Sequence, residues 1–180
     1  MKNAQDVLRF WFEEIPRKQW FMKDPAFDEL VRKNFLETHL QVSRGETFTW
    51  RKLAEGRLAE IIVLDQFSRN MFRDTPMSFQ FDSLALVLAQ EAVSSGADQA
   101  LMLDQRAFIY MPYMHSESLK IHDEAVRLFS QSGLENSLNF EIQHKKIIER
   151  FGRYPHRNAV LGRISTPEEI EFLKGPGSSF

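Results

Sequence analysis

The strongest constraint in this sequence is the regular spacing of helix-start and helix-stop signals along the chain. Asp24 stands directly before Pro25, which pairs a side-chain N-cap with a proline at the first helical position. Thr166 and Pro167 repeat that pair near the C-terminal end, and Gly152 follows an apolar-periodic run as a helix-ending glycine does. No segment shows the two-residue alternation of a half-buried strand. The sequence therefore predicts an all-helical (all-α) protein.

The signals divide the chain into helices separated by short breaks. The segments expected to be helical are 3–14, 24–45, 50–72, 75–96, 98–110, 116–133, 137–151 and 165–169. Pro76 is expected to open the fourth helix, Pro112 to stop the fifth, and Ser116 to cap the sixth. Short breaks favour antiparallel neighbours, so we expect helical hairpins stacked as a short tetratricopeptide-repeat-like superhelix of about eight helices. No linker divides residues 1–180, which predicts a single domain with 174–180 as a frayed tail.

Composition narrows the class of protein. The net charge of −2 does not indicate a general nucleic-acid-binding surface. The absence of cysteine excludes disulfides, thiol nucleophiles and cysteine-ligated metals. No run approaches the roughly 18 apolar residues of a membrane span, and the first residues lack a secretory signal pattern, so we expect a cytoplasmic protein without a membrane partner. No cofactor motif is present, so no cofactor is predicted, and the sequence leaves the oligomeric state open.

The first of three polar clusters is the segment LDQFSRN. Asp65 and Arg69 continue an apolar helical stripe and stand four residues apart, so they can pair along the helix. One interpretation is an ion pair at the edge of the core, because charges are buried only when paired. The other is that Asp65 orients Arg69 towards a ligand.

The second cluster is QRAFIYMPYMHSE, and its candidate ligand-binding residues are Arg106, Tyr110, His115 and Glu117. Glu117 also has a structural interpretation, because an acidic side chain suits the start of a helix. His115 opens a helical stripe with His122, and a histidine on such a stripe is more often a hydrogen-bonded core residue than a ligand. No HExxH or equivalent spacing is present, so no metal site is predicted.

The third cluster is RFGRYPHRNAVLGR, in which Arg153, His156, Arg157 and Asn158 are candidate ligand-binding residues on an irregular loop. Residues 141–163 contain six Lys and Arg against two Asp and Glu, a local charge of +4. Arginine presents a fixed charge and a planar fork of donors suited to carboxylates and phosphates. The loop is therefore a solvated surface, a partner of internal acids such as Asp65 or Glu117, or a site for an external anion.

These segments resemble an uncharacterised bacterial family, domain of unknown function 924. The resemblance runs from about Val7 to Leu173 and rests on VLRFWF, LDQFSRNMFR followed by Pro76, Phe79 and Asp82, RAFIYMPYMHSE, and RFGRYPHRNAVLGR followed by STPEE. It implies an all-helical fold similar to tetratricopeptide-repeat superhelices and no established reaction. Family members often carry an acidic residue before the arginine of RAFIYMP, where this chain has Gln105.

Three functions fit these residues. The first is a binding module that holds a small anionic molecule or an acidic peptide in a groove lined by the Arg and His clusters. The second is an enzyme in which a histidine oriented by Asp65 or Glu117 acts as acid or base and arginines anchor the substrate. The third is a purely structural polar network. We favour the binding module, and we expect the three clusters to converge around one groove.

Overall fold

The computed structural model describes residues 1–180 and contains helices and turns without a β-strand. The prediction of an all-helical fold is confirmed. The chain forms two compact units, which are described one at a time. Unit 1 comprises Met1–Arg73 and Met77–Pro112, and unit 2 comprises Asp74–Pro76 and Tyr113–Phe180. The expected single domain and tetratricopeptide-repeat-like superhelix stay predictions.

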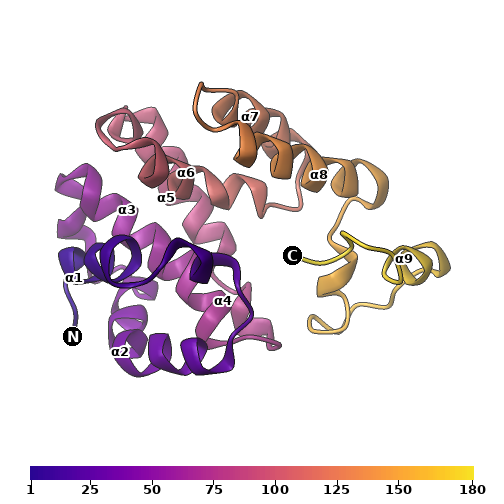
Figure 1. Cartoon of the computed structure of the whole chain (residues 1–180), viewed down its shortest axis with the longest axis horizontal. Coiled ribbons are helices and arrows are strands. Elements are labelled where there is room, and N and C mark those ends of the chain that lie inside the picture. The colour runs from indigo at the N-terminus through magenta and orange to yellow at the C-terminus, as the bar shows by residue number, and fades with distance from the viewer. The chain divides into compact units, whose positions relative to one another are not determined.

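Unit 1 contains the first six α-helices (Figure 1). These are α1 (Ala4–Arg9), α2 (Pro25–Ser43), α3 (Ala54–Ile62), α4 (Ser68–Met71), α5 (Asp82–Ser94) and α6 (Leu103–Met114), whose last two residues belong to unit 2. Short 3-10 helices are η2 (Arg17–Phe21), η3 (Phe48–Lys52), η5 (Pro76–Ser78), which begins in unit 2, and η6 (Ala97–Ala100). Two π-helical turns, η1 (Phe10–Glu14) and η4 (Val63–Phe67), continue α1 and α3.

The core of unit 1 is aromatic. Phe35 packs between Phe10 and Phe67, with ring centroids 4.9 and 4.7 Å away, and Trp11 lies 5.5 Å from Phe67. Gly56 lets η3 approach α3, because a Cβ atom at this position would lie 2.0 Å from the carbonyl oxygen of Trp50. Ring contacts of Phe10, Phe35 and Phe67 thus join η1, α2 and η4.

Unit 2 contains α7 (Leu119–Phe129), α8 (Glu135–Phe151), the 3-10 turn η7 (Pro155–Arg157) and α9 (Pro167–Phe172). Helices α7 and α8 form a hairpin and lie side by side in Figure 1. One hydrophobic cluster of unit 2 contains buried Ile147, Ile148 and Tyr154, with Phe151 and Phe172 packed against it. Ala125, Leu128 and Phe129 of α7 are also buried. Apolar burial therefore supports the hairpin of unit 2, and polar contacts hold the loop that follows α8.

Local capping signals are reproduced where they were clearest. Asp24 caps α2 through its carboxylate, and Gly152 ends α8 in the left-handed conformation with φ of 67°. Thr166 and Glu169 form a capping box at α9, with Pro167 at the first helical position. These ends depend on residues within one turn of each other, which is why the sequence alone predicts them.

Three expected boundaries are wrong. Pro76 opens only η5, and α5 begins at Asp82, whose carboxylate is held by an arginine of α4. Helix α6 continues through Pro112, because a proline in the last turn removes only one helical hydrogen bond. Ser118, rather than Ser116, is the N-cap of α7, since the carbonyl of Ser116 accepts a hydrogen bond from a histidine of that helix. No helix of the structure is both long enough and apolar enough to span a bilayer.

Candidate functional site

In unit 1, Arg69 is held by two carboxylates. Its Nη1 lies 3.1 Å from Asp65 Oδ1, which confirms the in-helix pair. The guanidinium also donates to both carboxylate oxygens of Asp82, at 2.9 and 3.0 Å, and lies over the ring of Phe79. Asp65 is buried and lies in the π-helical turn η4, and such turns occur frequently at functional sites. The position of Asp82 in the sequence motif is explained by this second carboxylate contact.

Arg106 and Tyr110 fix the connection between η6 and α6. Arg106 donates to the backbone carbonyls of Asp98, Gln99 and Leu101. The Tyr110 hydroxyl donates to the buried carboxylate of Asp98 at 2.5 Å. These contacts order a turn of unit 1.

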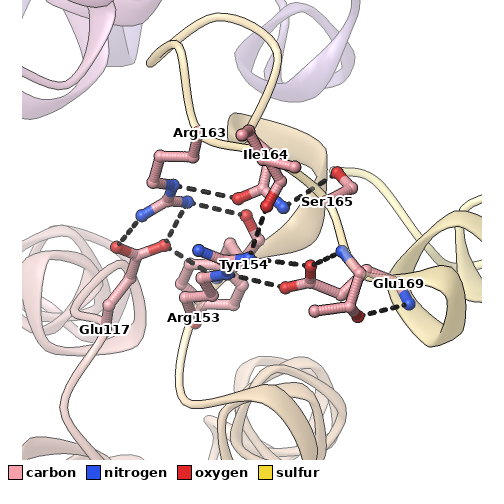
Figure 2. Close-up of polar contacts among 9 residues, drawn as sticks. Glu117, Arg153, Tyr154, Arg163, Ile164, Ser165 and Glu169 are labelled. Atoms are coloured by element: carbon pink, nitrogen blue, oxygen red, sulfur yellow. Dashed lines mark hydrogen bonds and ion pairs between the residues drawn. The ribbon is translucent and has the colours of Figure 1, made fainter.

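In unit 2, the loop after α8 is held by α9 through Arg153 (Figure 2). Arg153 donates to both carboxylate oxygens of Glu169, at 2.6 and 2.8 Å, and to the carbonyl of Ile164 at 3.0 Å. Hydrogen bonding from Arg153 lowers the pKa of the Glu169 carboxyl to about 2. The same carboxylate accepts the backbone N–H of Thr166 in the capping box, so one side chain caps α9 and fixes the loop.

A second carboxylate, Glu117, holds the other end of the loop. It accepts two hydrogen bonds from Arg163, at 2.7 and 2.9 Å, and one from the backbone N–H of Tyr154 at 2.7 Å (Figure 2). Burial raises the pKa of Glu117, but hydrogen bonds from Arg163 and the Tyr154 N–H more than offset it, so this pKa lies below its ordinary value. Arg163 also donates to Asn158 Oδ1 and to the Tyr154 carbonyl. We call Glu117, Arg153, Arg163 and Glu169 the loop frame.

The acid–arginine pairs of the loop frame differ from those expected from the sequence. Glu117 binds Arg163, and Glu169 binds Arg153. The expected pairing with internal acids such as Asp65 or Glu117 therefore includes Glu117, but Glu169 was not among the acids named from the sequence. Glu117 also lies directly before Ser118, the N-cap of α7, and its carboxylate faces the loop. Asn158 is buried, and its amide donates to the Ser165 hydroxyl at 3.0 Å.

Arg157 and His156 lie inside this frame. Arg157 is buried, donates to the carbonyl of His115 at 3.0 Å and lies with its guanidinium carbon 4.8 Å from the centroid of the Tyr154 ring. His115 and His156 are half-buried. The structure thus brings together four candidates from two segments, namely His115, Glu117, Arg157 and Asn158, around the backbone of Tyr154.

His122 of α7 and Glu141 of α8 form a fully buried pair, with His122 Nδ1 2.6 Å from Glu141 Oε1. His122 Nε2 faces the carbonyl of Ser116 at 2.8 Å, so Nε2 carries a proton, because a carbonyl oxygen only accepts. Burial raises the pKa of Glu141, and its other oxygen is buried without a partner. The hydrogen-bonded core interpretation holds for His122.

His144 of α8 is the other buried histidine of unit 2, at 6% exposure. Its Nδ1 donates to the Phe140 carbonyl at 2.7 Å, one turn back in its own helix, so Nε2 is an unprotonated acceptor directed away from the helix. Burial above all, together with the charges of His115, His122 and His156, lowers the pKa of His144 to about 3. Three histidines from other segments therefore lie within electrostatic range of His144.

The C-terminal segment covers this histidine cluster. The ring of Phe180 lies 3.7 Å from His144, 4.6 Å from His156 and 5.1 Å from Tyr154, measured between centroids. Phe180 is nevertheless 54% exposed, so its burial contributes about 2 kcal/mol at ~25 cal/mol per Å². Ordering each preceding residue costs about 1–2 kcal/mol, so one half-buried ring holds this segment only marginally. The expected fraying of 174–180 stays a prediction.

Comparison with known proteins places these residues in a family. The family model described as a bacterial protein of unknown function, DUF924, matches residues 7–177. The chain belongs to this bacterial family of unknown function. A solved structure of a protein of unknown function from Agrobacterium tumefaciens is 40% identical, with a TM-score of 0.91 over 96% of this chain and 97% of that one. No curated protein matches.

The sequence-predicted residues fall into two groups. Asp65, Arg69, Arg106 and Tyr110 lie in unit 1, whereas His115, Glu117, Arg153, His156, Arg157 and Asn158 lie in unit 2. The convergence of all three clusters on one groove stays a prediction. No group of three or more His, Asp or Glu side chains has the arrangement of a metal site.

Sequence reasoning missed several members of these clusters. Asp82 and Glu169 both lie in the motifs that carry the family resemblance, and this is the signal that could have marked them as partners of the arginines. His144 and Glu141 lie three residues apart on α8, which puts both on the face that packs against α7. Nothing in the sequence predicts the ring contacts of Phe180, because it follows a stretch of glycine, proline and serine that is typical of loops.

Proposed function

We propose that this protein is a cytoplasmic binding protein for a small anionic molecule or acidic peptide, and that the ligand meets the histidine cluster of unit 2. The observation that carries the proposal is the gathering of histidines around Tyr154: the ring centroids of His122, His144 and His156 lie 6.2, 5.9 and 5.7 Å from its ring. The His115 carbonyl accepts a hydrogen bond from Arg157, whose guanidinium lies over the same ring. A bound anion stabilises the imidazolium form of a neighbouring histidine. His115 and His156 are half-buried and supply the ligand-facing charge, whereas His122 and His144 lie beneath them.

In this proposal the loop frame positions the site and does not contact the ligand. Glu117 and Glu169 already accept the forks of Arg163 and Arg153. Their role is to fix the backbone from Tyr154 to Asn158, so that a ligand meets preset side chains. Pre-organisation of this kind raises affinity by lowering the entropy lost on binding.

The enzymatic alternative has weaker support. Both nitrogens of His122 are occupied, by Glu141 and by the Ser116 carbonyl, so this carboxylate-oriented imidazole has no open nitrogen to act as a base. In unit 1, His39 Nε2 lies 2.8 Å from the hydroxyl of Ser68, but both side chains are fully buried away from any substrate.

The test is anion binding by the whole chain at two pH values. Calorimetric titration with phosphate and with a short acidic peptide is run at pH 6 and pH 8. Binding should be at least about fivefold tighter at pH 6, because histidine is the side chain that gains positive charge between pH 8 and pH 6. His156→Gln should abolish that pH dependence. Lys146→Gln, which removes an exposed charge from α8, should leave it unchanged. Absence of binding by either anion at both pH values would favour the purely structural network.

A further inference from the structure

Phe180 packs against a surface of aromatic rings, which we call the recess. Three rings from two segments line it: His144 from α8, and Tyr154 and His156 from the loop around η7. Phe180 meets Tyr154 and His156 nearly edge to face, at interplanar angles of 83° and 71°. Such T-shaped contacts are the arrangement that aromatic rings prefer.

The occupant is weakly attached to the rest of the chain. The segment from Gly175 to Phe180 contains two glycines and two serines, and its only side-chain hydrogen bond joins the Ser178 hydroxyl to the Leu173 carbonyl, five residues back. Gly177 has a φ of 72°, a left-handed conformation that glycine adopts without strain. Beyond this local turn, the ring of Phe180 is what joins the segment to the recess.

The recess also contains a polar atom that Phe180 does not satisfy. His144 is more than nine-tenths buried, and its Nδ1 is committed to the Phe140 carbonyl. Its Nε2 makes no hydrogen bond and is directed away from α8, and the rings of Tyr154 and Phe180 pack against the same imidazole. This nitrogen is not fully buried, so a ligand that brings a donor can satisfy it.

The geometry points to a binding site for a small aromatic acid that carries a hydrogen-bond donor on its ring, with Phe180 as the displaceable occupant. The ring takes the place of Phe180 against His144, Tyr154 and His156, and its donor meets Nε2 of His144. The acidic group faces the half-buried histidines, His115 and His156. This inference rests on the proposed anion binding and adds the chemical class of the ligand.

Four probes separate the parts of the inference in calorimetric titrations of the whole chain. 4-Hydroxybenzoate has the ring, the donor and the carboxylate; benzoate lacks the donor, phenol lacks the carboxylate, and cyclohexanecarboxylate lacks the aromatic ring. We expect 4-hydroxybenzoate to bind at least about tenfold tighter than each of the other three. Phe180→Ala should tighten its binding about fivefold or more, because a competing occupant is removed. The matched control is Phe48→Ala, which removes another exposed phenylalanine, in unit 1.

The second variant tests the acceptor. His144→Asn retains a donor for the Phe140 carbonyl but lacks Nε2, so it should bind 4-hydroxybenzoate no better than benzoate. Unchanged or weaker binding by Phe180→Ala would overturn the displaceable occupant. Equal binding of cyclohexanecarboxylate and 4-hydroxybenzoate would overturn the aromatic site while leaving anion binding intact. Equal binding of phenol and 4-hydroxybenzoate, without phosphate binding, would keep the aromatic site and remove the anion.

Discussion

Units 1 and 2 differ in the contacts that hold the regions described above: aromatic packing in unit 1 and charged hydrogen bonds in the loop of unit 2. Unit 1 has a cluster of rings: Phe10, Trp11 and Phe35 each contact Phe67, and all four are almost fully buried. In unit 2, the loop after α8 is fixed by the Glu117–Arg163 and Arg153–Glu169 pairs. Apolar burial is non-directional, whereas charge-assisted hydrogen bonds fix both distance and angle.

That difference separates what stabilises the chain from what places a site. A ring cluster tolerates small shifts of its members, so it supports a fold without holding any polar group at a set position. The paired forks of unit 2 hold the backbone around Tyr154 at fixed distances. The loop of unit 2 is therefore better suited to a ligand site than the ring cluster of unit 1, and the ring cluster contributes more to stability.

The largest expected effect comes from the rings of unit 1. Phe67→Ala should lower the free energy of unfolding by about 3–5 kcal/mol, because it removes a fully buried ring that contacts Phe10, Trp11 and Phe35. Phe48→Ala, at a residue that is 64% exposed, should cost less than about 1 kcal/mol. Urea unfolding of both variants measures the contrast. A loss below about 1 kcal/mol for Phe67→Ala would show that the ring cluster is not the main support of unit 1.

A smaller effect should appear on lowering the pH, and each unit contributes one histidine to it. Burial lowers the pKa of His39 in unit 1 to about 4 and that of His144 in unit 2 to about 3. Both side chains are thus neutral when folded at pH values where the unfolded chain, with a histidine pKa near 6.5, binds protons. The stability is present above pH 6.5 and is lost as the pH falls towards 4 and 3. Each histidine should contribute about 2 kcal/mol of that loss between pH 6.5 and 4.5.

Matched variants assign the pH effect to its unit. His39→Gln preserves a polar group near the Ser68 hydroxyl, and His144→Asn preserves one near the Phe140 carbonyl. Each should flatten the dependence of unfolding free energy on pH by about half. If neither variant changes the slope between pH 6.5 and 4.5, the two imidazoles are not kept neutral by burial.

Sequence reasoning succeeded where partners are near each other in the chain. The caps at Asp24, Gly152 and Thr166 and the Asp65–Arg69 pair all lie within one or two helical turns. It failed at Pro112, because the proline's position in the final turn of α6 decided the outcome. The periodicity of apolar residues in a single sequence predicts that a helix forms. It does not fix the residue at which that helix ends, because the end also depends on the residues packed around it.

The candidate site shows the same limit. Arg153 was recognised as a guanidinium that needs an anion, but its partner Glu169 lies 16 residues away in another helix. The choice between Glu117 and Glu169 depends on how α7 and α9 approach the loop, which no local pattern encodes. The contact between His144 and Phe180 is even harder to predict from the sequence, because it joins a helix to the end of a glycine- and serine-rich segment.

A double-mutant cycle on Glu117 and Arg163 tests most directly whether the loop of unit 2 is held by directed charge pairs. Glu117→Gln, Arg163→Met and the double variant are compared with the unchanged chain by urea unfolding. The two hydrogen bonds from Arg163 to Glu117 predict a coupling energy of about 1.5–3 kcal/mol. The exposed Arg150–Glu168 pair is the control and should couple by less than about 0.5 kcal/mol. A coupling energy for Glu117 and Arg163 as small as that of the control would contradict the frame.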